Sequence, residues 1–281
     1  MKIKGIEKVV YANEHAMGKL RVKQPLPSQN IDYLDPFVLL HHAKSWVTDD
    51  YAQKHQGVDP HPHRGFAPVT FVFEGGVEHR DSRGNKQSVY SGGVQWMNAG
   101  MGIVHSERPA MAGTQEIIQM WVNVPAKNKM DQPTYYPFNK EQLPTYQGEQ
   151  IEMAVVSGEL KSLKGPVPTY TDINSAMIRG QKGSTLALDI PDHHHTFLYI
   201  LDGKIRLGNQ VIEKHHMVVF AQDGEHIELK LEEDSKALLM SGTPIKESMV
   251  AQGPFVLNNE TEIMEAYRDY RIGKMGVLIE D

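Results

Sequence analysis

The chain has 281 residues, a formal net charge of −6 and no cysteine. Its length is sufficient for two domains of ordinary size. The lack of cysteine excludes disulfide bonds and thiol chemistry. No basic run or basic-aromatic patch is present, which argues against direct binding to nucleic acid. The first residues lack the apolar core of a signal peptide, and no stretch reaches membrane-spanning length, so we expect a cytoplasmic protein without membrane contact.

The first notable pair in chain order is His61 and His63, with one proline between them. Successive side chains on a β-strand point to opposite faces, so residues two apart share a face and can address one point. Residues 69–75 and 77–81 are rich in β-branched and aromatic residues, which favours strands, and residues 82–85 have the composition of a hairpin turn. The pair therefore lies next to predicted strands.

A second pair with the same spacing, His105 and Glu107, follows a glycine-rich stretch at residues 99–102. Glycines at this density suit a sharp corner or a close backbone approach beside a pocket. Residues 116–124 predict another strand, ended by Pro125. The region is typical of a small antiparallel barrel or jelly roll.

Two facing strands with these pairs would present three imidazoles and one carboxylate to a common metal ion. In a chain with 14 histidines, a single pair two apart is commonly a surface or packing feature. The second pair, with its matching spacing, favours the metal site instead. Such a set suits a catalytic transition metal rather than a closed structural zinc site.

Several stretches resemble pirins, which are members of the cupin superfamily with two barrels in one chain. They comprise residues 61–66, 77–82, 93–97, 102–107, 120–127 and 253–258, and the resemblance runs from about residue 35 almost to the C-terminus. It implies an all-β fold of two cupin-type antiparallel β-barrels (jelly rolls) with a short C-terminal helix.

The resemblance also implies an iron site in the N-terminal barrel, with His61, His63, His105 and Glu107 as ligands and one Fe(II) per chain. Manganese, nickel, copper or zinc would bind the same ligands. Glu107 is also predicted to be catalytic, because a carboxylate ligand that loosens can accept a hydroxyl proton from the substrate. No cofactor besides the metal is expected.

Two departures from the family pattern concern the pocket rather than the ligands. Ala67 and Pro68 stand where pirins commonly have a glutamate and a threonine, and His41 and His42 occupy a stretch that is often acidic. Both departures predict a changed pocket charge and therefore a changed substrate.

The predicted domain boundaries follow composition. Residues 1–126 form the N-terminal metal-binding barrel, 127–148 an irregular, proline-containing linker, 149–245 the C-terminal barrel, and 246–281 a tail. In pirins this tail returns to the N-terminal barrel, so the resemblance implies the same packing here.

The tail contains a predicted helix. Asn259 can cap its start, an apolar stripe contains Ile263, Tyr267 and Tyr270, and Gly273 ends it.

The second barrel is expected to lack a complete metal site. Aligning residues 71–75 with 199–203 places Asp189 and Pro191 where the first barrel has its two paired histidines. His226 and Glu228 have the same spacing as His105 and Glu107, but no first pair of histidines accompanies them. The run His193, His194 and His195 is predicted to form a loop edge that is solvated or binds metal adventitiously.

The leading functional prediction is an iron-dependent, quercetin 2,3-dioxygenase-like enzyme that opens a flavonol such as quercetin with O₂, as the resemblance implies. The alternative is an iron- and redox-responsive regulator that binds a transcription factor or a metabolic enzyme. In a third reading the metal only stabilises the barrel, but the absence of a fourth histidine or cysteine favours chemistry. The protein is expected to be a monomer.

Overall fold

The computed structural model describes residues 2–18 and 20–280. The chain divides into two compact units, and each is described by itself. The unit called the first barrel here contains His15–Val22, Phe37–Lys140 and the chain from Ile245 onward. The unit called the second barrel contains the chain up to Glu14, Lys23–Pro36 and Glu141–Pro244.

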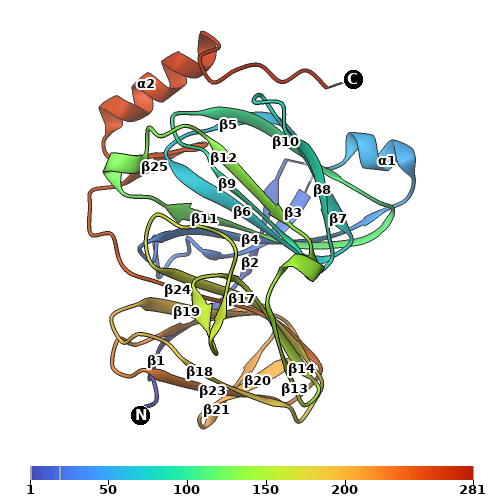
Figure 1. Cartoon of the computed structure of the whole chain (residues 1–281), viewed down its shortest axis with the longest axis vertical. Helices are drawn as coiled ribbons and strands as arrows, with labels where there is room; N and C mark the ends of the chain where they lie inside the picture. Colours follow the sequence, from blue (N-terminus) through green and yellow to red (C-terminus); the bar gives the residue numbers. More distant parts are fainter. Residues whose placement is uncertain (1, 19, 281) are drawn as a thin grey trace. The chain divides into compact units, whose positions relative to one another are not determined.

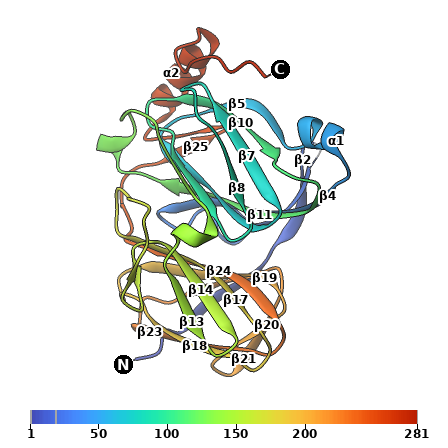
Figure 2. The ribbon, with the colours of Figure 1, turned by 45° about the vertical axis from the view of Figure 1, so that its right-hand side comes forward.

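The first barrel consists of two antiparallel sheets that face one another (Figures 1 and 2). The larger sheet has the order β12 (Thr134–Phe138), β9 (Val94–Asn98), β6 (Phe66–Glu74), β11 (Gly113–Asn123), β4 (Phe37–Val47), β3 (Leu20–Leu26) and β2 (Asn13–Met17). The smaller sheet has the order β5 (Val58–His63), β10 (Ile103–Pro109), β7 (Gly76–Asp81) and β8 (Lys86–Tyr90).

The second barrel repeats this arrangement. Its larger sheet has the order β1 (Ile6–Tyr11), β22 (His216–Phe220), β19 (His195–Asp202), β24 (Ser235–Gly242), β17 (Ile173–Gly180), β14 (Ile151–Ser157) and β13 (Thr145–Gly148). Its smaller sheet has the order β18 (Thr185–Asp189), β23 (His226–Leu231), β20 (Lys204–Leu207) and β21 (Gln210–Glu213). A continuous apolar core fills the space between these sheets.

The remaining elements are short. They are the helices α1 (Asp50–His55) and α2 (Glu260–Arg271), the 3₁₀ turns Ala126–Asn128 and Lys140–Gln142, and the two-stranded pairs β15 (Glu159–Leu160) with β16 (Leu163–Lys164) and β25 (Val250–Gln252) with β26 (Phe255–Leu257). No helix among the described residues is long and apolar enough to cross a bilayer. The predicted all-β fold of two barrels with a short C-terminal helix is confirmed.

The predicted capping of helix α2 is also confirmed, because the Asn259 side chain accepts a hydrogen bond from the amide of Glu262 at 3.0 Å. The predicted stripe needs one correction. Ile263 and Ala266 are buried, whereas Tyr270 is 38% exposed. The buried residues of the helix, Ile263, Ala266 and Asp269, are spaced three apart, so the buried face turns away from Tyr270.

The segment expected to be an irregular linker contributes strands to both barrels. β12 pairs with β9, and β13 pairs with β14. Pro137 lies within β12, which is the edge strand of its sheet, where a missing backbone N–H costs no ladder hydrogen bond. Pro137 therefore indicates an edge strand, whereas from the sequence alone the prolines of this segment indicate an irregular linker.

The N-terminal residues pack with the second barrel, although the sequence assigned them to the first. β1 pairs with β22 along most of its length. The chain around Gly5 continues this contact, since the backbone N–H of Ala221 donates to the carbonyl of Gly5 at 2.8 Å. Pairing between strands so distant in sequence leaves no local signal in either strand.

Candidate metal centre

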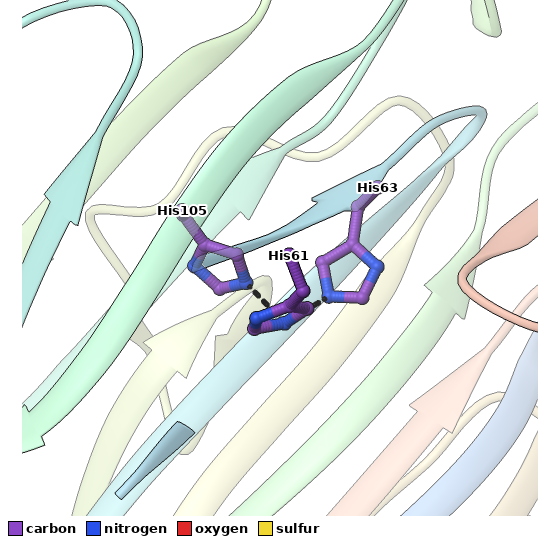
Figure 3. Close-up of side chains that lie close together, drawn as sticks. All are labelled: His61, His63 and His105. Carbon is purple, nitrogen blue, oxygen red and sulfur yellow. Dashed lines mark hydrogen bonds between the residues drawn. The ribbon is translucent and has the colours of Figure 1, made fainter. Parts of the chain in front are cut away.

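Three histidines converge inside the first barrel because β5 and β10 pair with His61 directly opposite His105. His63 lies two residues along β5 and so points to the same side. The Nε2 atom of His61 lies 3.1 Å from that of His63 and 3.0 Å from that of His105 (Figure 3). The alternation expected from the sequence therefore brings three of the four predicted ligands to one point.

The backbone fixes the protonation of two of these rings. The Nδ1 atom of His61 lies 2.8 Å from the carbonyl oxygen of Asp59, and that of His63 lies 3.1 Å from the carbonyl oxygen of Pro254. A carbonyl only accepts hydrogen bonds, so each Nδ1 carries the hydrogen. In the neutral rings, both Nε2 lone pairs then face the centre.

The third ring is oriented by a buried histidine and a buried aspartate on β7. Nε2 of His79 lies 2.8 Å from a carboxylate oxygen of Asp81, and Nδ1 of His79 lies 3.3 Å from Nδ1 of His105. The carboxylate accepts the Nε2 hydrogen of His79, which leaves Nδ1 of a neutral His79 to accept from His105. We therefore assign an Nε2 lone pair to His105 as well. In metal sites, a hydrogen-bond partner on the ring nitrogen that does not bind the metal holds a ligand histidine in one tautomer.

All three imidazoles are held in the neutral form that binds metal. Burial lowers the pKa of His61, and it lowers the pKa of His63 and His105 well below 6.5. The other rings of the group lower the pKa of His63 and His105 further. The three lone pairs converge within 4.8 Å of one another. Neutral lone pairs this close repel one another unless a cation lies between them, so these donors fit a divalent transition metal.

Glu107, the fourth predicted ligand, lies outside this group. In the described part of the chain, one set of three or more histidine or acidic side chains has ligand atoms within 4.8 Å of one another, and it contains the three histidines alone. Glu107 is 5% exposed, and its carboxylate is bound by side chains of the larger sheet. These are Gln95 and Thr70, at 2.5 and 2.7 Å from Oε1, and Gln119, at 2.6 Å from Oε2.

The hydrogen bonds to Glu107 leave part of its carboxylate available. A carboxylate has about four lone-pair sites, and three are used here. Gln95 is itself oriented by Tyr135, whose hydroxyl donates to the amide oxygen at 2.8 Å. Burial, and then Glu107 and Asp81, raise the pKa of Tyr135, so its hydroxyl keeps the proton that it donates.

Sequence reasoning did not identify the residues around the ligands. His79 and Asp81 are spaced two apart on a predicted strand, the same signal that identified the ligand pairs. Thr70, Gln95 and Gln119 lie on separate strands, and only the sheet register brings them together.

The C-terminal segment also contacts the centre. Besides the carbonyl of Pro254, it supplies Glu280, whose carboxylate accepts hydrogen bonds from Ser106 and Arg108 on β10. Arg108 also donates to the side chain of Asp59 at 2.8 Å. Figure 1 shows the chain beyond α2 running back along this side of the barrel.

Comparison with known proteins assigns the chain to a family. The Pirin family model matches residues 19–122, and the model of the Pirin C-terminal cupin domain matches residues 176–276. A pirin-like protein of Solanum lycopersicum is 35% identical over 260 residues, which cover 91% of this chain and 87% of the relative. The chain belongs to the pirin family. The predicted membership and the cupin identity of the barrels are confirmed.

Other pirin relatives extend over nearly the whole chain. Human pirin is 32% identical over 262 residues, which cover 91% of this chain and 88% of the human protein. The crystal structure of a quercetin 2,3-dioxygenase from Acinetobacter baumannii is 31% identical, has a TM-score of 0.92, and covers 99% of this chain and 100% of that one.

The second barrel of this pirin can be aligned with the first through its turns. The glycine that follows β6, Gly75, has φ of 80°, and the glycine that follows β19, Gly203, has φ of 81°. An added Cβ at Gly203 would lie 2.2 Å from a backbone oxygen, so the turn requires glycine. The two glycines therefore mark equivalent positions.

Counting from these glycines shows what replaces the ligands. His79, four residues beyond Gly75, pairs with Glu107, and Leu207, four residues beyond Gly203, pairs with Leu229. Leu229 is thus the counterpart of Glu107. The counterparts of the three histidines follow from the β18–β23 register and are aliphatic: Leu188, Ile190 and Ile227. All four positions are at most 2% exposed.

The sequence alignment of this barrel was therefore wrong by one residue. Asp189 and His226 do pair, at 2.8 Å between side chains, but their strands turn the aliphatic neighbours into the core. A shift of one residue moves every side chain of a strand to the other face. The conclusion that this barrel lacks the first barrel's ligand set does not depend on that alignment.

The histidine run at the start of β19 is not uniformly solvated, contrary to expectation. The His193 side chain is 61% exposed, but His194 is fully buried with Nδ1 3.2 Å from the Ser241 hydroxyl. His195 lies with Nδ1 2.6 Å from the carbonyl of Asp35. His193 and His194 lie in the turn before β19, where the backbone N–H of His194 donates to the carbonyl of Pro191 at 3.2 Å, and this turn places the His194 ring inward.

We expect His79→Phe to weaken metal binding by about tenfold to a hundredfold. This is the usual effect of removing the residue that hydrogen-bonds the other ring nitrogen of a ligand histidine. Phenylalanine retains a flat ring against Tyr135, whose ring centroid lies 4.1 Å from that of His79, but cannot accept from His105. Competition with a chelator measures the affinity, and His55→Phe on the exposed surface is the control. Equal affinities in wild type and His79→Phe would contradict the assignment.

We expect the metal-free protein to lose stability as the pH falls below about 6.5. An unfolded histidine takes up its proton near that value, whereas the buried ligands take theirs up at lower pH. The unfolded chain therefore binds more protons in this window, so acidification favours unfolding. As the pH is lowered, the midpoint temperature of unfolding should fall less steeply in His63→Gln than in wild type or in His193→Gln. Identical slopes in all three would refute this.

Proposed function

We propose that this pirin is an iron-dependent dioxygenase that cleaves a flavonol such as quercetin with O₂. The observation that carries the proposal is the convergence of three neutral histidines, in which Nε2 of His61 lies 3.1 Å from that of His63 and 3.0 Å from that of His105. The relation to the Acinetobacter baumannii quercetin 2,3-dioxygenase supports the same reaction.

His61, His63 and His105 would hold Fe(II), with Glu107 as a further ligand. Bound iron would supply adjacent open coordination positions for substrate and O₂, together with Lewis acidity. A histidine set without a fourth histidine or cysteine leaves room for this chemistry.

As a ligand that loosens from the metal, Glu107 would accept the proton of the substrate hydroxyl. Its carboxylate is fixed by Thr70, Gln95 and Gln119, which orients the remaining lone pair. A buried base that is already oriented loses little freedom when it receives a proton.

A cavity in the first barrel gives access to Glu107. It lies between the two sheets, and its wall includes Glu107 and Gln119. The surface of this wall is mostly apolar, which limits the access of water to the carboxylate.

Oxygen uptake tests the proposal. The metal-free protein is loaded anaerobically with Fe(II), and O₂ consumption is followed after addition of quercetin. We expect one O₂ consumed per quercetin lost, with no uptake by the metal-free or zinc-loaded protein. Absence of uptake by protein with a full complement of iron would reject the enzyme and favour the regulatory alternative.

A further inference from the structure

A buried lysine lies where the C-terminal segment meets the end of strand β5. Lys129 is 1% exposed. Its ammonium donates to the carbonyl of Gly65 at 2.8 Å, to that of Val256 at 3.1 Å and to the side-chain oxygen of Asn123 at 2.5 Å. A lysine ammonium has three N–H donors. Each of them therefore has an oxygen acceptor, and the acceptors come from three separate parts of the first barrel.

A charged side chain at this position needs a physical reason, because burial penalises its charge. Burial lowers the pKa of Lys129 to about 8, although Glu247 and Glu262 act in the opposite direction. A methionine would fill a similar space without that penalty. The three matched oxygen atoms offset the penalty here, so we infer that the lysine serves the groups that it joins.

The groups that Lys129 joins belong to two backbone stretches that run side by side. One stretch is residues 63–65, at the end of β5, and the other is residues 254–256, at the turn into β26. The backbone N–H of Val256 donates to the carbonyl of Arg64 at 3.1 Å. An added Cβ at Gly65 would lie 2.2 Å from the carbonyl oxygen of Val256, so the two stretches are in close contact.

The ammonium of Lys129 stabilises this contact. It binds one carbonyl oxygen from each stretch, that of Gly65 and that of Val256. Carbonyl oxygens carry partial negative charge, so two that converge on one point repel each other unless a cation lies between them. Without the ammonium we expect the stretch at residues 254–256 to move away from the end of β5.

The same stretch supplies the hydrogen bond that fixes the tautomer of a ligand histidine. Nδ1 of His63 donates to the carbonyl of Pro254 at 3.1 Å. The corresponding bond of His61, to the carbonyl of Asp59, is 2.8 Å long and lies outside this contact. A length of 3.1 Å is near the long end of the usual range. A small movement of the turn would therefore break the bond of His63 and leave that of His61 intact.

We propose that Lys129 is a positioning residue of the metal centre, which holds the Pro254 carbonyl against Nδ1 of His63 and so keeps the Nε2 lone pair of His63 directed at the metal. The inference rests on the proposed function only for the role of the three histidines as metal ligands. If the carbonyl moves away, the neutral ring can carry its hydrogen on Nε2 instead. A ring in that form has no lone pair at Nε2 with which to bind a metal.

The tautomer can be measured directly in the metal-free protein at neutral pH. Nitrogen-15 NMR of histidine-labelled protein distinguishes a ring nitrogen that carries hydrogen from one with a lone pair, and His63→Gln identifies the signals of His63 by their loss. We expect wild type to carry the His63 hydrogen on Nδ1. In Lys129→Met a second form, with hydrogen on Nε2, should appear for His63, while His61 keeps the wild-type form.

Zinc binding measures the consequence for the metal centre. In competition with a chelator, Lys129→Met should bind Zn²⁺ about tenfold more weakly than wild type, the lower end of the usual effect of removing a group that orients a ligand histidine. Lys4→Met is the matched control, because Lys4 is 4% exposed in the second barrel and donates to the carbonyl of Asp192. It removes a buried lysine without changing the His63 signals or the zinc affinity.

Lys129→Gln provides a milder change, and it decides the question if Lys129→Met does not fold. Its side chain is one bond shorter and has two N–H donors for three oxygens, so both effects should appear in part. Wild-type His63 signals together with wild-type zinc affinity in the folded variant would overturn the inference, as would equal shifts for His61 and His63. Failure of the proposed function is a separate result, in which the effects of Lys129 remain while the iron-loaded wild type consumes no O₂ with quercetin.

Discussion

Replacing His105 by alanine should remove the metal from this pirin while leaving both barrels folded. The change deletes one of three converging donors and leaves His79 without its partner ring. Removing a residue that only hydrogen-bonds a ligand histidine weakens metal binding by about tenfold to a hundredfold. Removing the ligand itself should weaken metal binding by more. His63→Ala should behave in the same way.

The fold should survive because residues other than the metal ligands bury most of the apolar surface of each barrel. The second barrel has a large apolar core of its own, and the first buries aromatic side chains such as Phe71, Phe73 and Trp96. Cores of this size do not need a metal in order to bury apolar surface. Elemental analysis gives the metal content, and circular dichroism reports the fold.

His193→Ala provides the matched control for His105→Ala and should keep one equivalent of metal. Full metal content in His105→Ala would show that the centre is elsewhere. Unfolding of both His63→Ala and His105→Ala would instead support a purely structural metal. Two tightly held equivalents in wild type would mean that His194 or His226 had been misjudged.

Glu107→Gln should reduce flavonol oxidation far more than it reduces iron content. An amide cannot take up a hydroxyl proton at neutral pH, and a general base contributes about a hundredfold to ten-thousandfold in rate. The shape of the side chain is kept, so the three rings should still bind iron, although more weakly. Turnover per bound iron, with both quantities measured on one sample, separates these effects.

Glu228→Gln is the matched control for Glu107→Gln. Glu228 has a side-chain exposure of 63% in the second barrel, so the same chemical change there should leave turnover unaltered. Unchanged turnover per iron in Glu107→Gln would remove the base assignment. It would leave the histidine centre itself untouched.

The convergence of the three histidines could be predicted because its signal is local. A spacing of two on a strand determines that His61 and His63 share a face, whatever the rest of the fold does. The carboxylate of Glu107 shares the face predicted for it but is bound by Gln95, Thr70 and Gln119, which lie on three other strands. Nothing within any one of those strands marks its contribution.

The errors have the same origin in pairing between distant segments. The register of β18 and β23 decides whether Asp189 or Leu188 faces the core, and one residue separates the two outcomes. His41 was noted only as a departure in charge from the family pattern, and its place in the cavity wall follows from its pairing with Gln119.

Anomalous X-ray scattering at the iron edge, from crystals of the iron-loaded protein, tests the central claim most directly. We expect one strong peak per chain, between the Nε2 atoms of His61, His63 and His105, at roughly 2.1 Å from each, the usual length of a metal–imidazole bond. A peak beside His194 or His226, or no peak among the three converging rings, would contradict it.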